Sequence, residues 1–288
     1  MPELPEVEVL LRHLKPQLEG RVIGSPCILQ ARPIRPDVPR SLASALQGCR
    51  INTLSRRSKF LIFDLATPPE RGRGSLRILG HLGMTGRMFL QPLDVPIPKH
   101  TVLHFSATGE RFVFQDVRRF GRFTSDLSSL QDLGPEPWDA AFTPRYLRDL
   151  LQKSKQAIKV RLLDQSIVCG LGNIYVAEAL FRSGIDPRTA AGSLTQAQCE
   201  RLVPAIQNCL QEAVKLGASL ALGFDGTGSR DGLFYYGSDG EEEATPAPER
   251  FQVYDRAGSP CRQCNSVIQR IVQAARSTFY CPHCQRRR

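Results

Sequence analysis

The first residues of the chain combine a proline at position 2 with two nearby carboxylic acids, Glu3 and Glu6. Pro2 is a small second residue, so we expect removal of Met1, which leaves the secondary amine of proline as the N-terminus. An α-amino group has a pKa of roughly 7.7–8.0, so a useful fraction is an uncharged nucleophile at neutral pH. Its attack on an aldehyde or a sugar C1′ would give a cationic iminium, and the glutamates could move the protons that this chemistry needs. The structural alternative is that Pro5 occupies the first turn of a helix whose dipole the glutamates complement.

Four of the nine cysteines stand near the C-terminal end in two pairs, Cys261-x2-Cys264 and Cys281-x2-Cys284. This spacing is typical of a structural zinc site, in which four thiolates complete a tetrahedral shell and leave no open position for catalysis. The intervening segment has the pattern of a two-stranded hairpin, and it is too short to fold on a core of its own, so metal binding should supply folding energy. The alternatives are a redox or disulfide pair, or His283 as a competing ligand. We predict one structural zinc ion bound by the four cysteines.

A phosphate-binding site is indicated between residues 157 and 173, where the pattern is helix, extended link, glycine turn and new helix. Gly170 and Gly172 allow a close approach of the backbone, and the exposed N–H groups at the start of the following helix form an anion site. Asn173 can add a side-chain donor. Glycine turns often serve packing alone, but basic residues just upstream, among them Lys155, favour phosphate binding.

The composition of the chain suits a polyanionic partner. Its 288 residues can bury a substantial core and should form two domains with a small appendage. The net charge of +10 and the pI of about 9.4 favour nucleic acid, although a generally basic surface is the alternative. No apolar run reaches the roughly 18 residues of a membrane span. The N-terminus does not look like a signal peptide, so we expect a cytoplasmic protein.

Several blocks of sequence resemble one known family. The segment 1–8 (MPELPEVE) resembles the start of the formamidopyrimidine-DNA glycosylases, which excise oxidised purines. The resemblance continues through residues 81–86 (HLGMTG), 116–121 (DVRRFG) and 170–178 (GLGNIYVAE) to the C-terminal cysteines. These blocks occur in the family's order and span almost the whole chain.

The resemblance implies a bifunctional DNA glycosylase and abasic-site lyase that acts on oxidised purines in base-excision repair. Pro2 would then form the Schiff base with the sugar, Glu3 would manage protonation of the opening sugar, and Glu6 would orient the site. Lys59 and Arg276 would assist the β- and δ-eliminations, although the position of Lys59 is also that of a solvated strand end. The chemistry then requires no organic cofactor.

A glycosylase must flip its target nucleotide and fill the hole left in the stack. The resemblance implies that Met84 and Phe120 are apolar wedges and that Arg118 pairs with the orphaned base, with a preference for cytosine. Arg119 would bond phosphate or support the loop. Considered alone, Met84 and Phe120 would be core residues. The family usually has proline where this chain has Val117, a difference that loosens the turn.

Phosphate contacts are implied at three further positions. His100, at the start of a predicted strand, resembles a phosphate-contacting histidine of the family, with a plain strand-end histidine as the alternative. Asn173 matches the family's asparagine directly. Lys155 is the best match for the accompanying lysine, and Lys153 and Lys159 are alternatives.

The elements that position these residues give an α+β multidomain chain. An amphipathic helix is predicted from Pro5 to about Leu18, short strands follow from 21 to about 123, and helices dominate beyond a linker at 134–137. Strands without intervening helices favour a β-sandwich. The predicted domains are an N-terminal catalytic β-sandwich with its leading helix (1–135), a helical helix-two-turns-helix DNA-binding domain with a lesion loop at about 218–250 (136–250), and a four-cysteine β-hairpin zinc finger (251–288). We expect residues 223–240 to be mobile without DNA.

The predicted partner is double-stranded DNA with an oxidised base, in a nucleoid-associated protein for which a monomer suffices. One rival is an endonuclease VIII-type glycosylase for oxidised pyrimidines, whose members typically begin Met-Pro-Glu-Gly, whereas this chain has Leu4. The other rival is a non-catalytic zinc-finger protein that binds damaged DNA. That rival leaves the Pro2-Glu3 terminus and Lys59 as coincidences.

Overall fold

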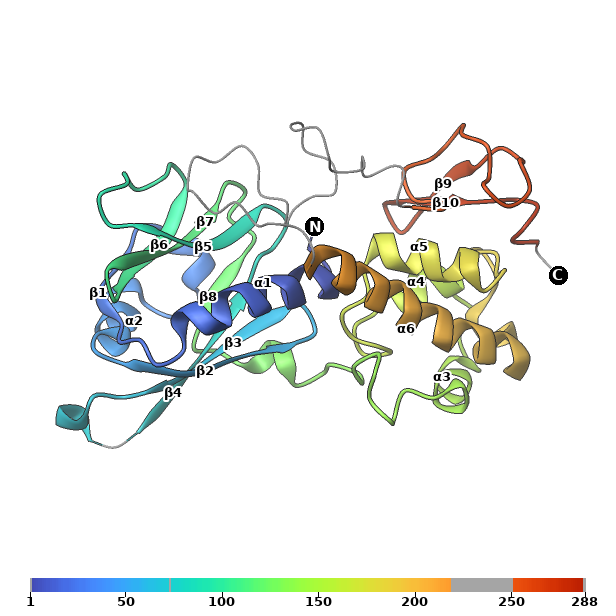
Figure 1. Cartoon of the computed structure of the whole chain (residues 1–288). Coiled ribbons are helices and arrows are strands. Elements are labelled where there is room, and N and C mark those ends of the chain that lie inside the picture. The colour runs from blue at the N-terminus through green and yellow to red at the C-terminus, as the bar shows by residue number, and fades with distance from the viewer. Residues whose placement is uncertain (1, 73, 219–250, 287–288) are drawn as a thin grey trace. The chain divides into compact units, whose positions relative to one another are not determined.

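The computed structural model describes residues 2–72, 74–218 and 251–286. The chain divides into two compact units. Among the described residues, the first unit comprises residues up to 131 together with 217–218, and the second comprises residues 132–216 and 251–286. The first unit carries the sheets and the second carries the helical segment and the C-terminal hairpin (Figure 1). The predicted lesion loop, apart from its first residue, and the predicted mobile segment 223–240 lie outside the described residues.

The first unit is a β-sandwich, as predicted. Its two four-stranded sheets have the strand orders β1-β6-β7-β5 and β2-β3-β4-β8, and every pairing is antiparallel. The strands are β1 (Gly24–Ile28), β2 (Arg50–Arg57), β3 (Phe60–Ala66), β4 (Ser75–His81), β5 (Gly86–Pro92), β6 (Thr101–Ala107), β7 (Glu110–Asp116) and β8 (Arg122–Thr124).

Alternation along the strands builds the core between the sheets. In β3 every second side chain is buried, which places Leu61, Phe63 and Leu65 on the inner face. The ring of Phe63 in one sheet lies 6.0 Å from that of Phe112 in the other, in an edge-to-face arrangement. Phe112 also stacks on Phe105 at 4.6 Å. Burial of each such ring stabilises the fold by roughly 1.5–3 kcal/mol.

Thr108-Gly109, a residue pair typical of a tight turn, joins β6 and β7 in a hairpin. Strands β6 and β7 pair up to this turn, and Thr108 and Gly109 have φ angles of 45° and 83°. Positive φ at both central residues gives the turn a twist that matches the flanking strands.

Helices flank the sandwich. The predicted N-terminal helix is α1 (Leu4–Leu18), which packs on β2 and β3 with its apolar face buried (Figure 1). One element was not expected, because α2 (Pro39–Leu46) interrupts the region that was predicted to hold strands alone. The sequence carried its signal, since Pro39 suits a first helical turn and Leu42 and Leu46 are one helical turn apart and buried.

The second unit begins with helices, as predicted. They are α3 (Pro144–Leu151), α4 (Ile158–Leu162), α5 (Asn173–Arg182) and α6 (Gln196–Ala218). The Thr143 hydroxyl accepts the N–H of Tyr146 at 3.1 Å and so caps α3. Thr195 and Gln198 form a capping box at the start of α6, with reciprocal bonds of 2.9 and 3.2 Å.

The C-terminal hairpin, β9 (Gln269–Gln273) and β10 (Arg276–Tyr280), packs against α5. Ala177 and Phe181 of that helix share a small apolar cluster with Phe279 and other residues of the hairpin segment. Between them on the helix, the Glu178 carboxylate is only 3% exposed. It accepts the backbone N–H groups of residues 252, 253 and 254 at 2.9, 3.0 and 2.9 Å. The helix therefore fixes the chain at the point where it enters the hairpin segment.

Within the described part of the chain, no helix has the length and apolar character needed to cross a membrane.

Candidate functional site

Two carboxylic acids are buried at the start of α1. Glu3 is 1% exposed and Glu6 is 4% exposed, and the N–H of Glu3 donates to Glu6 Oε2 at 2.8 Å. Pro5 lies in the first turn of the helix, so the structural reading of this segment is correct and compatible with the chemical one. Burial of carboxylates is costly unless they are bonded. The bond to Glu6 fixes the backbone directly after Pro2.

Lys59 lies in the tight turn between β2 and β3, after Ser58, whose φ is 57°. Its exposed fraction is only 8%, so the alternative of a solvated strand end is wrong. The next residue, Phe60, pairs with His81 across the sheet, and their ring centroids are 4.8 Å apart. Lys59 is close enough to His81 for its positive charge to lower the pKa of that imidazole.

The imidazole of His81 is neutral at physiological pH. Burial, together with the positive charges of Lys59 and Arg122, lowers its pKa from 6.5 to about 4, against the opposing influence of Asp116. The N–H of Gly83 donates to its Nδ1 at 3.1 Å. A neutral ring is required for that acceptor role, so the pKa shift and the shape of the turn after β4 depend on each other.

The fully buried carboxylate of Asp116, at the end of β7, organises the next loop. The hydroxyl of Thr85 donates to its Oδ1 at 2.7 Å, and the N–H of Arg118 donates to the same oxygen at 3.2 Å. The N–H of Gly121 donates to Oδ2 at 2.7 Å. Thr85 also accepts the Arg118 N–H at 3.1 Å, so it links the loop after β4 to the loop after β7.

These two loops lie side by side and present apolar side chains to solvent. A Cβ atom on Gly83 would come within 2.5 Å of the Gly121 nitrogen and 2.6 Å of the Phe120 carbonyl carbon, so the contact requires glycine. Met84 is 41% exposed and Phe120 is 42% exposed. The alternative that both are core residues is therefore wrong.

Three basic residues lie on or next to these loops. The Arg118 guanidinium lies over the ring of Phe120, with 4.9 Å from Cζ to the ring centroid. Arg119 is exposed, with a left-handed φ of 58°. His100 is also exposed, and its carbonyl accepts the N–H of Asp116 at 3.0 Å. Five predicted DNA-contacting residues of the first unit thus lie on these two loops or are hydrogen-bonded to their base through the backbone: Met84, His100, Arg118, Arg119 and Phe120.

In the second unit, the carbonyl oxygen of Ser277 in β10 accepts hydrogen bonds from two predicted site residues or their alternatives. It accepts Nδ2 of Asn173, at the start of α5, and Nζ of Lys159, in α4, both at 3.0 Å. Lys159 is fully buried and also bonds Thr278 Oγ1 at 2.6 Å, so it holds the hairpin in place. Lys155 is exposed and remains the better candidate for a phosphate contact.

Arg276 directly precedes Ser277 and is exposed. It follows a two-residue turn in which Ala274 and Ala275 have φ angles of 47° and 58°. The predicted residues Asn173 and Arg276 therefore share one hydrogen-bonded framework. The predicted site as a whole divides between the units. Pro2, Lys59 and the two loops after β4 and β7 belong to the first unit, and Lys155, Asn173 and Arg276 belong to the second.

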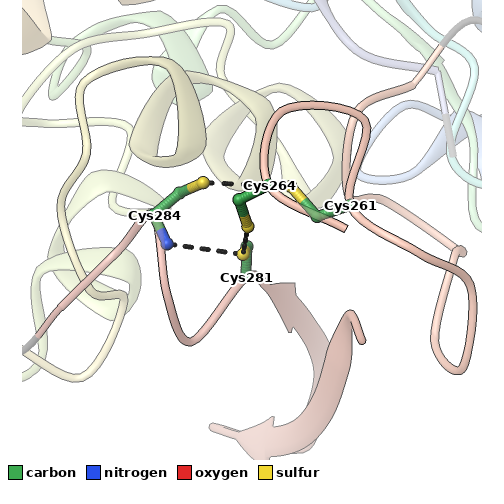
Figure 2. A group of neighbouring side chains, drawn as sticks. All are labelled: Cys261, Cys264, Cys281 and Cys284. Atoms are coloured by element: carbon green, nitrogen blue, oxygen red, sulfur yellow. Dashed lines mark hydrogen bonds between the residues drawn. The ribbon is translucent and has the colours of Figure 1, made fainter. Parts of the chain in front are cut away.

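The four predicted metal ligands converge, as Figure 2 shows. Their sulfur atoms all lie within 4.8 Å of one another, with 3.9 Å between Cys261 and Cys284 and 3.4 Å between Cys264 and Cys281. A tetrahedral zinc ion with Zn–S bonds of about 2.3 Å holds its sulfurs about 3.8 Å apart, so the set fits zinc. Among the described residues this potential metal-binding group consists of the cysteines alone, without His283.

Sequence reasoning missed four residues on which the geometry depends: Thr85, Asp116, Lys159 as an anchor of the hairpin, and Glu178. Each is a polar group whose partner is a backbone or side-chain group distant in sequence. Their only sequence signal was their place inside or beside the motif blocks, because burial of a polar residue is not visible from its type.

The chain matches family models along most of its length. Residues 1–123 match the formamidopyrimidine-DNA glycosylase N-terminal domain, residues 133–223 the formamidopyrimidine-DNA glycosylase H2TH domain, and residues 258–287 the zinc finger found in FPG and IleRS.

Similar proteins cover the chain from end to end. The formamidopyrimidine-DNA glycosylase of Paracoccus denitrificans is 40% identical over 306 aligned residues, which are 99% of this chain and 100% of that protein. That of Bacillus cereus is 38% identical over 296 residues, with both chains fully covered. The Lactococcus lactis enzyme, solved bound non-covalently to DNA with an AP site, superposes with a TM-score of 0.82 at 32% identity and covers 99% of this chain and 100% of its own.

Fold and site thus define a zinc-finger enzyme of the helix-two-turns-helix class. The chain belongs to the formamidopyrimidine-DNA glycosylase family.

Zinc content tests the cysteine cluster. We expect the purified protein to hold about one zinc ion per chain, and Cys281→Ser to hold almost none, because three thiolates leave the shell incomplete. Cys27→Ser, which alters a partly buried thiol in β1, is the matched control and should retain the metal. Full zinc occupancy in Cys281→Ser, measured by atomic emission, contradicts the assignment.

The neutral state of His81 predicts a pH dependence of stability. Between pH 6.5 and about 4 the unfolded chain binds a proton at this residue that the folded chain does not. The stabilisation is therefore complete above pH 6.5 and is lost as the pH falls to about 4. It amounts to at most about 3 kcal/mol in the free energy of unfolding. His81→Asn should flatten this dependence in urea unfolding at pH 7.5 and 5, and an unchanged slope would refute the assignment.

Proposed function

We propose that this protein is a bifunctional DNA glycosylase that excises oxidised purines, such as 8-oxoguanine and formamidopyrimidines, from duplex DNA and then cleaves the abasic site in base-excision repair. The observation that carries this proposal is the exposed pair Met84 and Phe120, held beside Arg118 on two interlocked loops in a chain of this family. Apolar wedges beside an arginine are the tools with which proteins open a base stack. Related structures contain DNA with an AP site or with a carbocyclic 8-oxo-G.

The N-terminal residues carry out the covalent chemistry in this proposal. After removal of Met1, the neutral amine of Pro2 attacks C1′ of the flipped nucleotide, and the base leaves with the electron pair of the glycosidic bond. Glu3 supplies and accepts the protons of sugar opening, and the bond from its N–H to Glu6 keeps the nucleophile's backbone in place. The product is a cationic iminium at C1′.

Strand cleavage follows from that iminium. Because the cation acidifies the adjacent C2′ proton, loss of this proton expels the 3′ phosphate by β-elimination, and δ-elimination then expels the 5′ phosphate. We assign Lys59 and Arg276 to assist these steps. Support comes from the burial of Lys59 beside His81 and from the exposure of Arg276 on its hydrogen-bonded hairpin.

DNA binding is distributed over both units. Arg118 would pair with the orphaned base, while His100, Arg119, Lys155 and Asn173 would contact phosphates. The exposed side chains of His100, Arg119 and Lys155 support this assignment. The three-part domain division at 135 and 250 is part of the proposal, with residues 218–250 as the lesion loop. A monomer suffices, because one chain carries one complete set of residues.

Of the two rivals, neither is supported as well. The endonuclease VIII reading does not account for the near full-length similarity to formamidopyrimidine-DNA glycosylases. A non-catalytic damage-binding protein does not account for the end-to-end similarity to named glycosylases either. Nucleoid association remains a proposal, based on the net charge of +10.

Substitution of the nucleophile tests the mechanism. Pro2→Gly should excise 8-oxoguanine opposite cytosine roughly a hundred-fold more slowly or worse, because the secondary amine that forms the iminium is lost. Pro92→Gly, which changes an exposed proline at the end of β5, should excise it at the wild-type rate. Circular dichroism checks that both variants are folded. Base excision by folded Pro2→Gly at the wild-type rate would overturn the assignment of Pro2.

A further inference from the structure

Two guanidinium groups, not one, lie over the ring of Phe120. Besides Arg118, with its Cζ 4.9 Å from the ring centroid, Arg32 has its Cζ 5.5 Å from the same centroid. Both distances are within the roughly 6 Å at which a cation is attracted to the face of an aromatic ring. The two arginines come from different parts of the chain, so the contact is not a consequence of sequence neighbourhood.

Arg32 is fixed to the same framework as the Phe120 loop. It opens the short 3-10 helix Arg32–Ile34, in which Ile34 is fully buried. Just beyond, the Asp37 carboxylate accepts the Thr124 hydroxyl at 2.6 Å and the N–H and hydroxyl of Ser125 at 2.7 and 2.6 Å. Thr124 ends β8, the strand that directly follows the Phe120 loop. The segment carrying Arg32 is thus tied down next to the loop.

In the part of the chain that the structure describes, Arg32 has no competing ion pair that would draw it away from the Phe120 ring. Its side chain is exposed, and among the described residues neither Arg32 nor Arg118 has an ion-pair partner. Among the described residues of the adjoining segments, Asp37 accepts hydrogen bonds from Thr124 and Ser125, and Asp116 is buried and accepts hydrogen bonds of its own.

We propose that Arg32 is a positioning residue that holds the Phe120 ring when Arg118 leaves it to pair with the base opposite the lesion. The inference rests on the proposed function, which assigns that pairing to Arg118. One guanidinium cannot lie over the ring and also in the plane of a base pair, so engagement of Arg118 leaves Arg32 as the cation on Phe120. Arg32 then acts on opposite-base preference without touching the base.

This role makes the effect of Arg32 depend on the opposite base. When cytosine stands opposite the lesion, Arg118 is engaged, and loss of Arg32 leaves the ring without a cation. When adenine stands there, Arg118 pairs poorly and can stay over the ring, so loss of Arg32 is compensated. A simple contact of Arg32 with phosphate would weaken binding to both duplexes equally.

The test is equilibrium binding to duplexes that carry a tetrahydrofuran abasic-site analogue opposite cytosine or adenine. We expect Arg32→Ala to raise the Kd opposite cytosine by roughly two- to five-fold and to leave the Kd opposite adenine nearly unchanged. Arg32→Lys should fall between wild type and Arg32→Ala. Arg40→Ala, an exposed arginine in α2, is the matched control and should change neither Kd. In a Phe120→Leu background, Arg32→Ala should have no further effect.

Two outcomes would overturn the inference. One is an unchanged Kd for folded Arg32→Ala opposite cytosine. The other is an equal loss opposite both bases together with a shallower salt dependence, which marks a phosphate contact. The analogue undergoes no base excision, so the binding test is separate from the chemistry. Failure of the wild-type protein to excise 8-oxoguanine would instead count against the proposed function.

Discussion

The buried carboxylate of Asp116 is the constraint on which the two loops that carry Met84 and Phe120 depend. It accepts the hydroxyl of Thr85 and the N–H groups of Arg118 and Gly121, and its own N–H binds the carbonyl of His100. A buried charge is tolerated only with such a complete set of donors, each contributing about 1.5–3 kcal/mol. The same bonds that satisfy the charge fix two loops as one body. Under the proposed function, the exposed apolar side chains on those loops would enter a base stack from a backbone that is already ordered.

In the second unit, the C-terminal hairpin is held in place by a different set of groups. A four-cysteine hairpin has little core of its own, so its folding depends on other stabilising contacts. The four sulfur atoms are placed to bind a zinc ion. Helix α5 adds the apolar contact of Phe181 and the hydrogen bonds of the Glu178 carboxylate. Lys159 and Asn173 bind one carbonyl, that of Ser277, directly beside Arg276. The residue that anchors the hairpin, Ser277, is thus the direct neighbour of Arg276, to which the elimination chemistry is assigned.

Much of this arrangement could be predicted from the sequence, because its signals are local. Strand alternation, helix caps, the Thr108-Gly109 turn and paired cysteine spacing each depend on a few neighbouring residues. Burial is not local. Lys59 looked like a solvated strand end and Met84 like a core residue, and the structure reverses both. The helix α2 was missed for a related reason, since eight residues with two apolar positions give a weak pattern amid strands.

The central claim is that an N-terminal secondary amine performs the chemistry. The most direct measurement is borohydride reduction of the protein incubated with a duplex carrying 8-oxoguanine opposite cytosine, followed by peptide mass spectrometry of any adduct. The account predicts a stable protein–DNA adduct mapped to Pro2, along with strand cleavage in the unreduced sample. Strand cleavage with an adduct on a lysine, or tight binding with neither adduct nor cleavage, would contradict it.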